Sequence, residues 1–212
     1  LFRFGDGGRG MKTVTVNIAD TSMLKTVSVS EESGSFSLTG ADVSADYILS
    51  LGKASADISG LSTTSVLSVS SSAGASMKIS DCRAKEFSLS GGGGNFSLSG
   101  ISADRADFSL KSGEIVGENV TFTELSSSSE NASLDLRSLD VSKASVNSVS
   151  GQVALRLSSD LTDFAVELAA KNASVFLNDV HYSSSYSIPN ESAEKSITVN
   201  TDTASILLNA AK

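Results

Sequence analysis

Between residues 86 and 110 the chain reads EFSLSGGGGNFSLSGISADRADFSL and contains the triplet Phe-Ser-Leu three times. Each triplet places a small polar residue between two apolar ones, which is the two-residue period of a β-strand with one buried face. The same alternation occurs at residues 36–38, 77–79, 120–122, 134–136, 153–155, 164–166 and 175–177. We therefore predict an all-β protein in which the two apolar side chains of each segment face the core.

These segments follow one another at about ten residues, or at about twice that distance. Such a period fits either a sandwich of hairpins or a solenoid with two strands per coil of roughly twenty residues. Hairpins need tight turns at nearly every strand pair, but Gly91–Gly94 is the one obvious glycine cluster, and we interpret it as a flexible turn. Other linking segments carry a single apolar residue, such as Cys82 or Ile101, which is typical of a coil corner. We predict a single-domain β-solenoid.

The domain is expected to cover residues 12–212, with residues 1–11 forming a disordered or linker end. A terminal cap is expected in about residues 178–212, because Ser183–Ser185 and Pro189 interrupt the repeat there. Residues 160–168 also fit a short amphipathic helix that begins at Asp160. We predict a strand instead, because Phe164, Val166 and Leu168 alternate in phase with the repeat.

The composition excludes several classes of partner. Of the 212 residues 40% are hydrophobic and 19% are charged, so the chain is expected to fold around a core. It has 16 Lys and Arg against 24 Asp and Glu, a net charge of −8, which disfavours nucleic acid as a partner. No run of about 18 apolar residues is present, so we expect no membrane span. The sequence begins with Leu, which suggests that an export signal or anchor has been removed.

Few residues are suited to site chemistry. The only Cys is Cys82 and the only His is His181, so neither an internal disulfide nor a four-ligand zinc site is expected. A nucleophilic triad would require His181 as its base, and a surface or turn residue is the simpler interpretation of that histidine. We expect no catalytic residues, no cofactor and no metal.

The sharpest acidic cluster is Asp104, Arg105 and Asp107. With Asp81 or Glu86 from a neighbouring coil, these side chains would resemble the carboxylates, calcium and Arg base of a polysaccharide-cleaving β-helix. A solvated corner with one local ion pair is the more ordinary interpretation. We therefore keep a polysaccharide lyase or hydrolase as the least favoured function.

Short motifs made of a small residue, Gly, a polar residue and an apolar residue occur at residues 33–36, 112–115 and 150–153. With the closing pattern of residues 153–208, they resemble a bacterial family of adhesin-like domains of unknown function, over roughly residues 13–210. The family usually has Asp after the Gly, where this chain has Ser35, Glu114 and Gln152. The resemblance implies an extracytoplasmic, β-solenoid-like domain and offers no catalytic residue.

The leading hypothesis is a non-enzymatic binding domain, adhesin-like and located on the cell surface or secreted, with a long regular face as its working surface. Its partner would be a cell-wall or host glycan or another surface protein. The alternative is a self-assembling β-helical scaffold, whose exposed coil ends would stack into filaments. The interrupted repeat near the carboxyl end favours a monomer.

Overall fold

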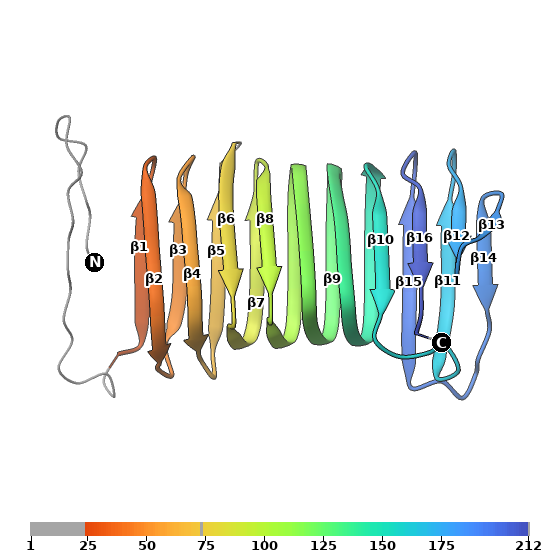
Figure 1. Ribbon diagram of the computed structural model, residues 1–212, viewed down its shortest axis with the longest axis horizontal. Helices are drawn as coiled ribbons and strands as arrows, with labels where there is room; N and C mark the ends of the chain where they lie inside the picture. Colours follow the sequence, from red (N-terminus) through yellow and green to blue (C-terminus); the bar gives the residue numbers. More distant parts are fainter. Residues whose placement is uncertain (1–23, 73, 212) are drawn as a thin grey trace.

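The computed structural model describes residues 24–72 and 74–211, and in them the chain forms a β-solenoid with no helix. Figure 1 shows the strands stacked side by side along one long axis, with the chain advancing from β1 at one end toward the carboxyl-terminal strands at the other. The predicted all-β solenoid is therefore confirmed. The expected linker at residues 1–11 lies outside the described residues. No helix among the described residues could cross a membrane.

The coils have two long faces. In spatial order, the first face consists of β1 (Thr26–Glu31), β3 (Asp46–Leu51), β5 (Val66–Ser71), β7 (Arg83–Gly91), part of β9 (Ser102–Ser150), β15 (Lys195–Thr201), β11 (Phe164–Ala170) and β14 (Ser185–Ile188). The second face consists of β2 (Ser35–Asp42), β4 (Ser55–Ser62), β6 (Ala75–Ser80), β8 (Gly94–Ser99), part of β9, β10 (Val153–Leu157), β16 (Ile206–Asn209), β12 (Val175–Leu177) and β13 (Val180–Tyr182). Neighbouring strands are parallel except for β11–β14 and β12–β13.

The inward side chains form one continuous core along the stack. In β6, Met77 and Ile79 are buried while Ser76 and Lys78 are exposed. The triplet at residues 96–98 follows the same pattern, and its Leu98 is only 2% exposed. The rings of Phe87, Phe108 and Phe122 follow one another in the core, with edge-to-face contacts at centroid distances of 5.9 and 6.0 Å.

The coil bends at two positions that recur in each turn. One bend follows the second face, where residues about 20 positions apart, or 40 in the last case, take a left-handed conformation with φ between 47° and 64°: Gly40, Gly60, Asp81, Gly100, Asn119, Ser138 and Asn178. Glycine, Asn and Asp are the residues that tolerate this conformation best. After Gly60, Asp81, Gly100, Asn119 and Ser138 the next residue turns inward, and Cys82 and Ile101 are buried as predicted.

The other bend joins the first face to the second and contains the glycine cluster. The interpretation of Gly91–Gly94 as a flexible turn is wrong, because a Cβ at Gly91 would lie 2.2 Å from the carbonyl oxygen of Ser71. The cluster is a tightly packed corner that lets the backbones of neighbouring coils approach each other. The last glycine of the cluster, Gly94, is the first residue of β8 and pairs in register with Ala75.

The carboxyl-terminal coils are not stacked in chain order. Strand β15 pairs with β9 on one side and with β11 on the other, and β16 lies between β10 and β12 in the same way. The chain thus leaves β10, skips one coil position, forms the coil of β11 and β12, and later returns to fill the gap (Figure 1). Of the predicted strand at residues 160–168, residues 164–168 lie in β11 as the in-phase alternation predicts, whereas residues 160–163 form the turn that precedes it.

Two antiparallel strands lie at the end of this stack. Tyr182 of β13 pairs with the buried Val175, and Tyr186 of β14 pairs with the buried Leu168. Both rings therefore lie on the core side of their strands, with centroids 4.3 Å apart. The segment for which a cap was expected, residues 178–212, contains this end cover and also β15 and β16, which form a full internal coil.

Candidate functional site

An open groove of about 880 Å³ lies on the second face of the described solenoid. It crosses five successive strands, β2, β4, β6, β8 and β9, and therefore runs along the stack rather than along any strand. We call it the second-face groove, and it is lined by Ser35, Phe36, Ser37, Ser55, Ala56, Asp57, Ser76, Met77, Lys78, Asn95, Phe96, Ser97, Glu114 and Val116.

Strand register arranges the outward residues of the groove in two columns. The first column contains Ser35, Ser55, Ser76, Asn95 and Glu114, and the second contains Ser37, Asp57, Lys78, Ser97 and Val116. All of these side chains are exposed except the half-buried Val116. Between the columns lie residues of the core, including Phe36, Met77 and Phe96, whose positions form the floor.

A column of small residues borders the groove at the corner: Gly34, Ala54, Ala75, Gly94 and Gly113. At Gly113, φ is +102° and a Cβ would lie 2.1 Å from the carbonyl oxygen of Gly94. Only glycine fits this position, so the corner keeps the coils in close register. The polar residue that follows each small residue therefore occupies the same position in every coil, and these residues form the first column.

The polar side chains of the groove have no partner within the described residues. No ion pair joins Asp57, Lys78 or Glu114 to another side chain there, although Asp57 and Lys78 are register neighbours. Elsewhere hydroxyls on the surface do pair, as when Ser70 Oγ donates to Ser50 Oγ at 3.2 Å on the first face. The groove thus presents donors and acceptors that remain available to a ligand.

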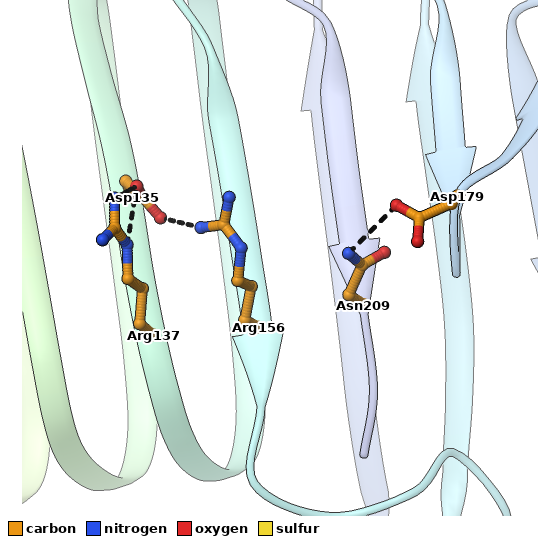
Figure 2. A network of polar contacts seen from close by, with 5 residues as sticks. All are labelled: Asp135, Arg137, Arg156, Asp179 and Asn209. Atoms are coloured by element: carbon orange, nitrogen blue, oxygen red, sulfur yellow. Dashed lines mark hydrogen bonds and ion pairs between the residues drawn. The ribbon is translucent and has the colours of Figure 1, made fainter. Parts of the chain in front are cut away.

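Farther along the second face, the charged side chains pair with one another (Figure 2). The Arg137 guanidinium donates to Asp135 Oδ2 from Nη2 at 2.7 Å and from Nε at 3.1 Å, and Arg156 Nη1 donates to the other carboxylate oxygen. The hydrogen bonds that Arg137 donates to the Asp135 carboxylate raise the pKa of Arg137. Asn209 Nδ2 donates to Asp179 Oδ1 at 3.4 Å. Asp135, Arg137 and Arg156 are thus paired with one another, unlike the charged side chains of the groove, whereas Asn209 Oδ1 is buried without a hydrogen-bond partner among the described residues.

The acidic cluster predicted from the sequence lies on the first face and is divided. Arg105 pairs with Glu124 of the next coil at 3.2 Å, and both side chains are largely exposed. Glu86 is the register neighbour of Arg105, whereas Asp81 lies at the left-handed bend beside Gly100. Asp104 and Asp107 are exposed on either side of the buried Ala106. The arrangement is that of a local surface ion pair.

Cys82 and His181 are far apart along the stack. Cys82 is buried in the core just before β7, and burial raises the pKa of its thiol. His181 is exposed on β13 near the carboxyl-terminal end, with its Nε2 3.1 Å from Ser174 Oγ and its ring 5.1 Å from that of Phe176. The two residues cannot act on one substrate atom in this fold.

Sequence reasoning missed the groove itself, although a signal was present. The motifs at residues 33–36 and 112–115 contain Gly34–Ser35 and Gly113–Glu114, the corner residue and the first groove residue of two coils. Aligning every coil on its corner residue would have collected the first column. The coil length varies between 19 and 21 residues across these five positions, which hides the column from a fixed period.

Comparison with known proteins gives one match. A family model described as Toastrack DUF4097 matches residues 2–208, close to the range over which the adhesin-like resemblance was expected. No curated protein and no solved structure matches the chain. The match covers nearly all of the solenoid, including both columns of the second-face groove and the carboxyl-terminal coils.

Proposed function

The chain belongs to the Toastrack DUF4097 family, a β-solenoid-like family of unknown function, and we propose that it acts as a non-enzymatic binding domain. The observation that carries the proposal is the second-face groove, with polar side chains on five successive coils that have no partner within the described residues. Such unpaired groups, held in register by a rigid scaffold, form an extended binding surface.

The positions of the reactive side chains support the proposal that the domain binds its partner and does not catalyse a reaction. Cys82 is sealed in the core, and His181 is on the last antiparallel strand of the second face. The acidic cluster around Arg105 is exposed on the first face and engaged in a surface ion pair. None of these three features, Cys82, His181 and the acidic cluster, borders the groove. A polysaccharide lyase or hydrolase therefore remains the least supported function.

We place the domain outside the cytoplasm, on the cell surface or secreted, in the manner of an adhesin. This part of the proposal rests on the adhesin-like resemblance of the three corner motifs and of residues 153–208. A cell-wall or host glycan, or another surface protein, is then the expected partner. A long groove open to solvent is compatible with a partner much larger than the domain.

A self-assembling scaffold is less well supported. Filament growth by stacking requires an open strand pair at both ends of the solenoid. At the carboxyl-terminal end, the short antiparallel strands β13 and β14 cover the last coil, and Tyr182 and Tyr186 lie over its core. We therefore favour a monomer whose faces, rather than its ends, carry the function.

The proposal is tested by measuring how a fluorescently labelled domain binds to intact bacterial cells and isolated envelopes. The D57A/K78A double variant removes two charged groove side chains without changing the net charge, and we expect it to lose most of the binding. The matched control is D107A/K143A, which removes the same pair of residue types from exposed positions on the first face. Equal binding by the two variants and the parent would contradict the proposal.

A further inference from the structure

We propose that the second-face groove binds an extended, ribbon-like chain of uncharged sugars, hexoses or N-acetylhexosamines, lying along the long axis of the solenoid. This inference rests on the proposed binding function and names its ligand class. It is carried by three features of the groove: its direction, the chemistry of its two columns, and the pairing state of the strands beneath it.

The direction of the groove sets the shape of the ligand. Five strands contribute to it, and neighbouring strands lie about 4.8 Å apart, so the groove extends roughly 19 Å across them. Equivalent residues recur once per strand, so an extended polymer that advances by a similar length per unit meets a new set of contacts at each unit. A sugar of an extended glycan chain has that length, and a compact ligand would use only one or two coils.

The chemistry of the columns sets the class of the ligand. The groove offers short hydroxyls from serines, the amide of Asn95, the carboxylates of Asp57 and Glu114, and the ammonium of Lys78. These groups include donors and acceptors on neighbouring coils, which suits a ligand with hydroxyl or acetamido groups on every unit. Two carboxylates against one ammonium disfavour a polyanion, and a net charge of −1 spread over five coils is too small to select a polycation.

The backbone beneath the groove argues against the other polymer classes. An extended peptide that adds to a sheet needs a free strand edge, but β4, β6 and β8 are each paired on both sides. Helical peptides dock through an apolar stripe, whereas the exposed side chains of the two columns are nearly all polar. Nucleic acid would need several Lys or Arg to neutralise phosphates, and the groove contains only Lys78.

The test is isothermal titration of the full chain with chito-oligosaccharides and with cello-oligosaccharides, from the disaccharide to the hexasaccharide. We expect affinity for at least one series to increase with length until the sugar chain spans the five coils, and then to level off. Replacing Asn95 with Ala removes the amide of the first column and is expected to weaken binding on the order of tenfold. The D107A/K143A control on the first face should bind as the parent does.

The outcomes separate this inference from the proposed function. If neither oligosaccharide series binds, while D57A/K78A still loses envelope binding, the glycan assignment is wrong and the binding function stands. Loss of envelope binding after protease treatment of the envelopes would assign the groove to a protein partner and would also overturn the glycan. If affinity is independent of sugar length, or unchanged by N95A, the proposed alignment along the groove is wrong.

Discussion

At the scale of single residues, the fold depends on which side of the strand each side chain occupies. Short polar residues face outward and large apolar residues face inward, so that Leu49, Ile58, Ile79 and Leu89 are fully buried in β3, β4, β6 and β7. The tyrosines depart from this division, because they carry a polar hydroxyl into or onto the core, as Tyr47 and Tyr182 illustrate. Tyr47 is 2% exposed within β3, and Tyr182 lies at the end of the stack.

These tyrosines make stability sensitive to alkaline pH. Burial raises the pKa of both side chains, with a further contribution from Asp42 at Tyr47 and from Tyr186 at Tyr182. A pKa that is raised in the folded state leaves stability intact below the unfolded pKa of about 10, and stability falls as pH rises from there through the folded pKa. The free energy of unfolding should therefore decrease above about pH 10.

Urea unfolding of the parent and of Tyr182→Phe across this pH range checks the prediction. The variant cannot ionise at position 182, so its unfolding midpoint should fall less steeply with pH than that of the parent. Parallel curves for the two proteins would mean that Tyr182 does not lose a proton preferentially on unfolding.

At the scale of the strand and its corner, the coils repeat a backbone conformation more strictly than they repeat a residue type. The left-handed bend is occupied by Gly40 in one coil and by Asn119 in another, with φ of +57° and +54°. The corner beside the groove is stricter, because there the backbones of neighbouring coils come into contact. Gly113 is the clearest case, since its missing Cβ makes room for the carbonyl oxygen of Gly94.

Substitution at these two positions should therefore have different effects. Gly113→Ala must relieve both an overlap and a strained φ, so we expect a loss of at least about 1–3 kcal/mol in the free energy of unfolding. The control is Gly40→Asn, where nothing lies within 4 Å of the new Cβ and Asn tolerates the conformation. Chemical denaturation of both variants tests this, and equal losses would show that close contact at the corner is unimportant.

At the scale of the whole molecule, the order of the coils in space differs from their order in the chain. The coil of β15 and β16 follows the other described coils in the sequence, but it lies inside the stack between two earlier coils. Its residues Ile197, Val199, Ile206 and Leu208 are almost completely buried. The solenoid beyond β10 is therefore held together by its carboxyl-terminal segment.

Native-state hydrogen exchange should reveal this arrangement. Chain ends usually fray, yet both edges of β15 and of β16 are paired, so their amides should be protected as strongly as those of β9. The antiparallel strands β13 and β14, each paired on one side within the described residues, should exchange faster and serve as the internal comparison. Faster exchange in β15 than in β14 would contradict the intercalated order.

The sequence predicted the local pattern well and the long-range pairing poorly. The alternation of Phe96, Ser97 and Leu98 identifies inward and outward residues because it depends only on a strand and its neighbours. The intercalation of residues 195–209 was not predicted, because each coil presents a similar apolar stripe and so many pairings look equally good. The groove was missed for a related reason. Asp57, Lys78 and Asn95 become neighbours only after the register of unequal coils is known.

The central claim is that the second-face groove is the binding surface of this solenoid. The most direct measurement is a nuclear magnetic resonance titration of the labelled full chain with chitotetraose, recording amide and side-chain shifts. The account predicts shifts concentrated at the groove residues of β2, β4, β6 and β8, including the Asn95 side-chain amide, with the first-face strands β1, β3 and β5 unchanged. Shifts confined to the first face or to the carboxyl-terminal cover would contradict it, whereas no shift with either chitotetraose or cellotetraose would overturn only the glycan assignment.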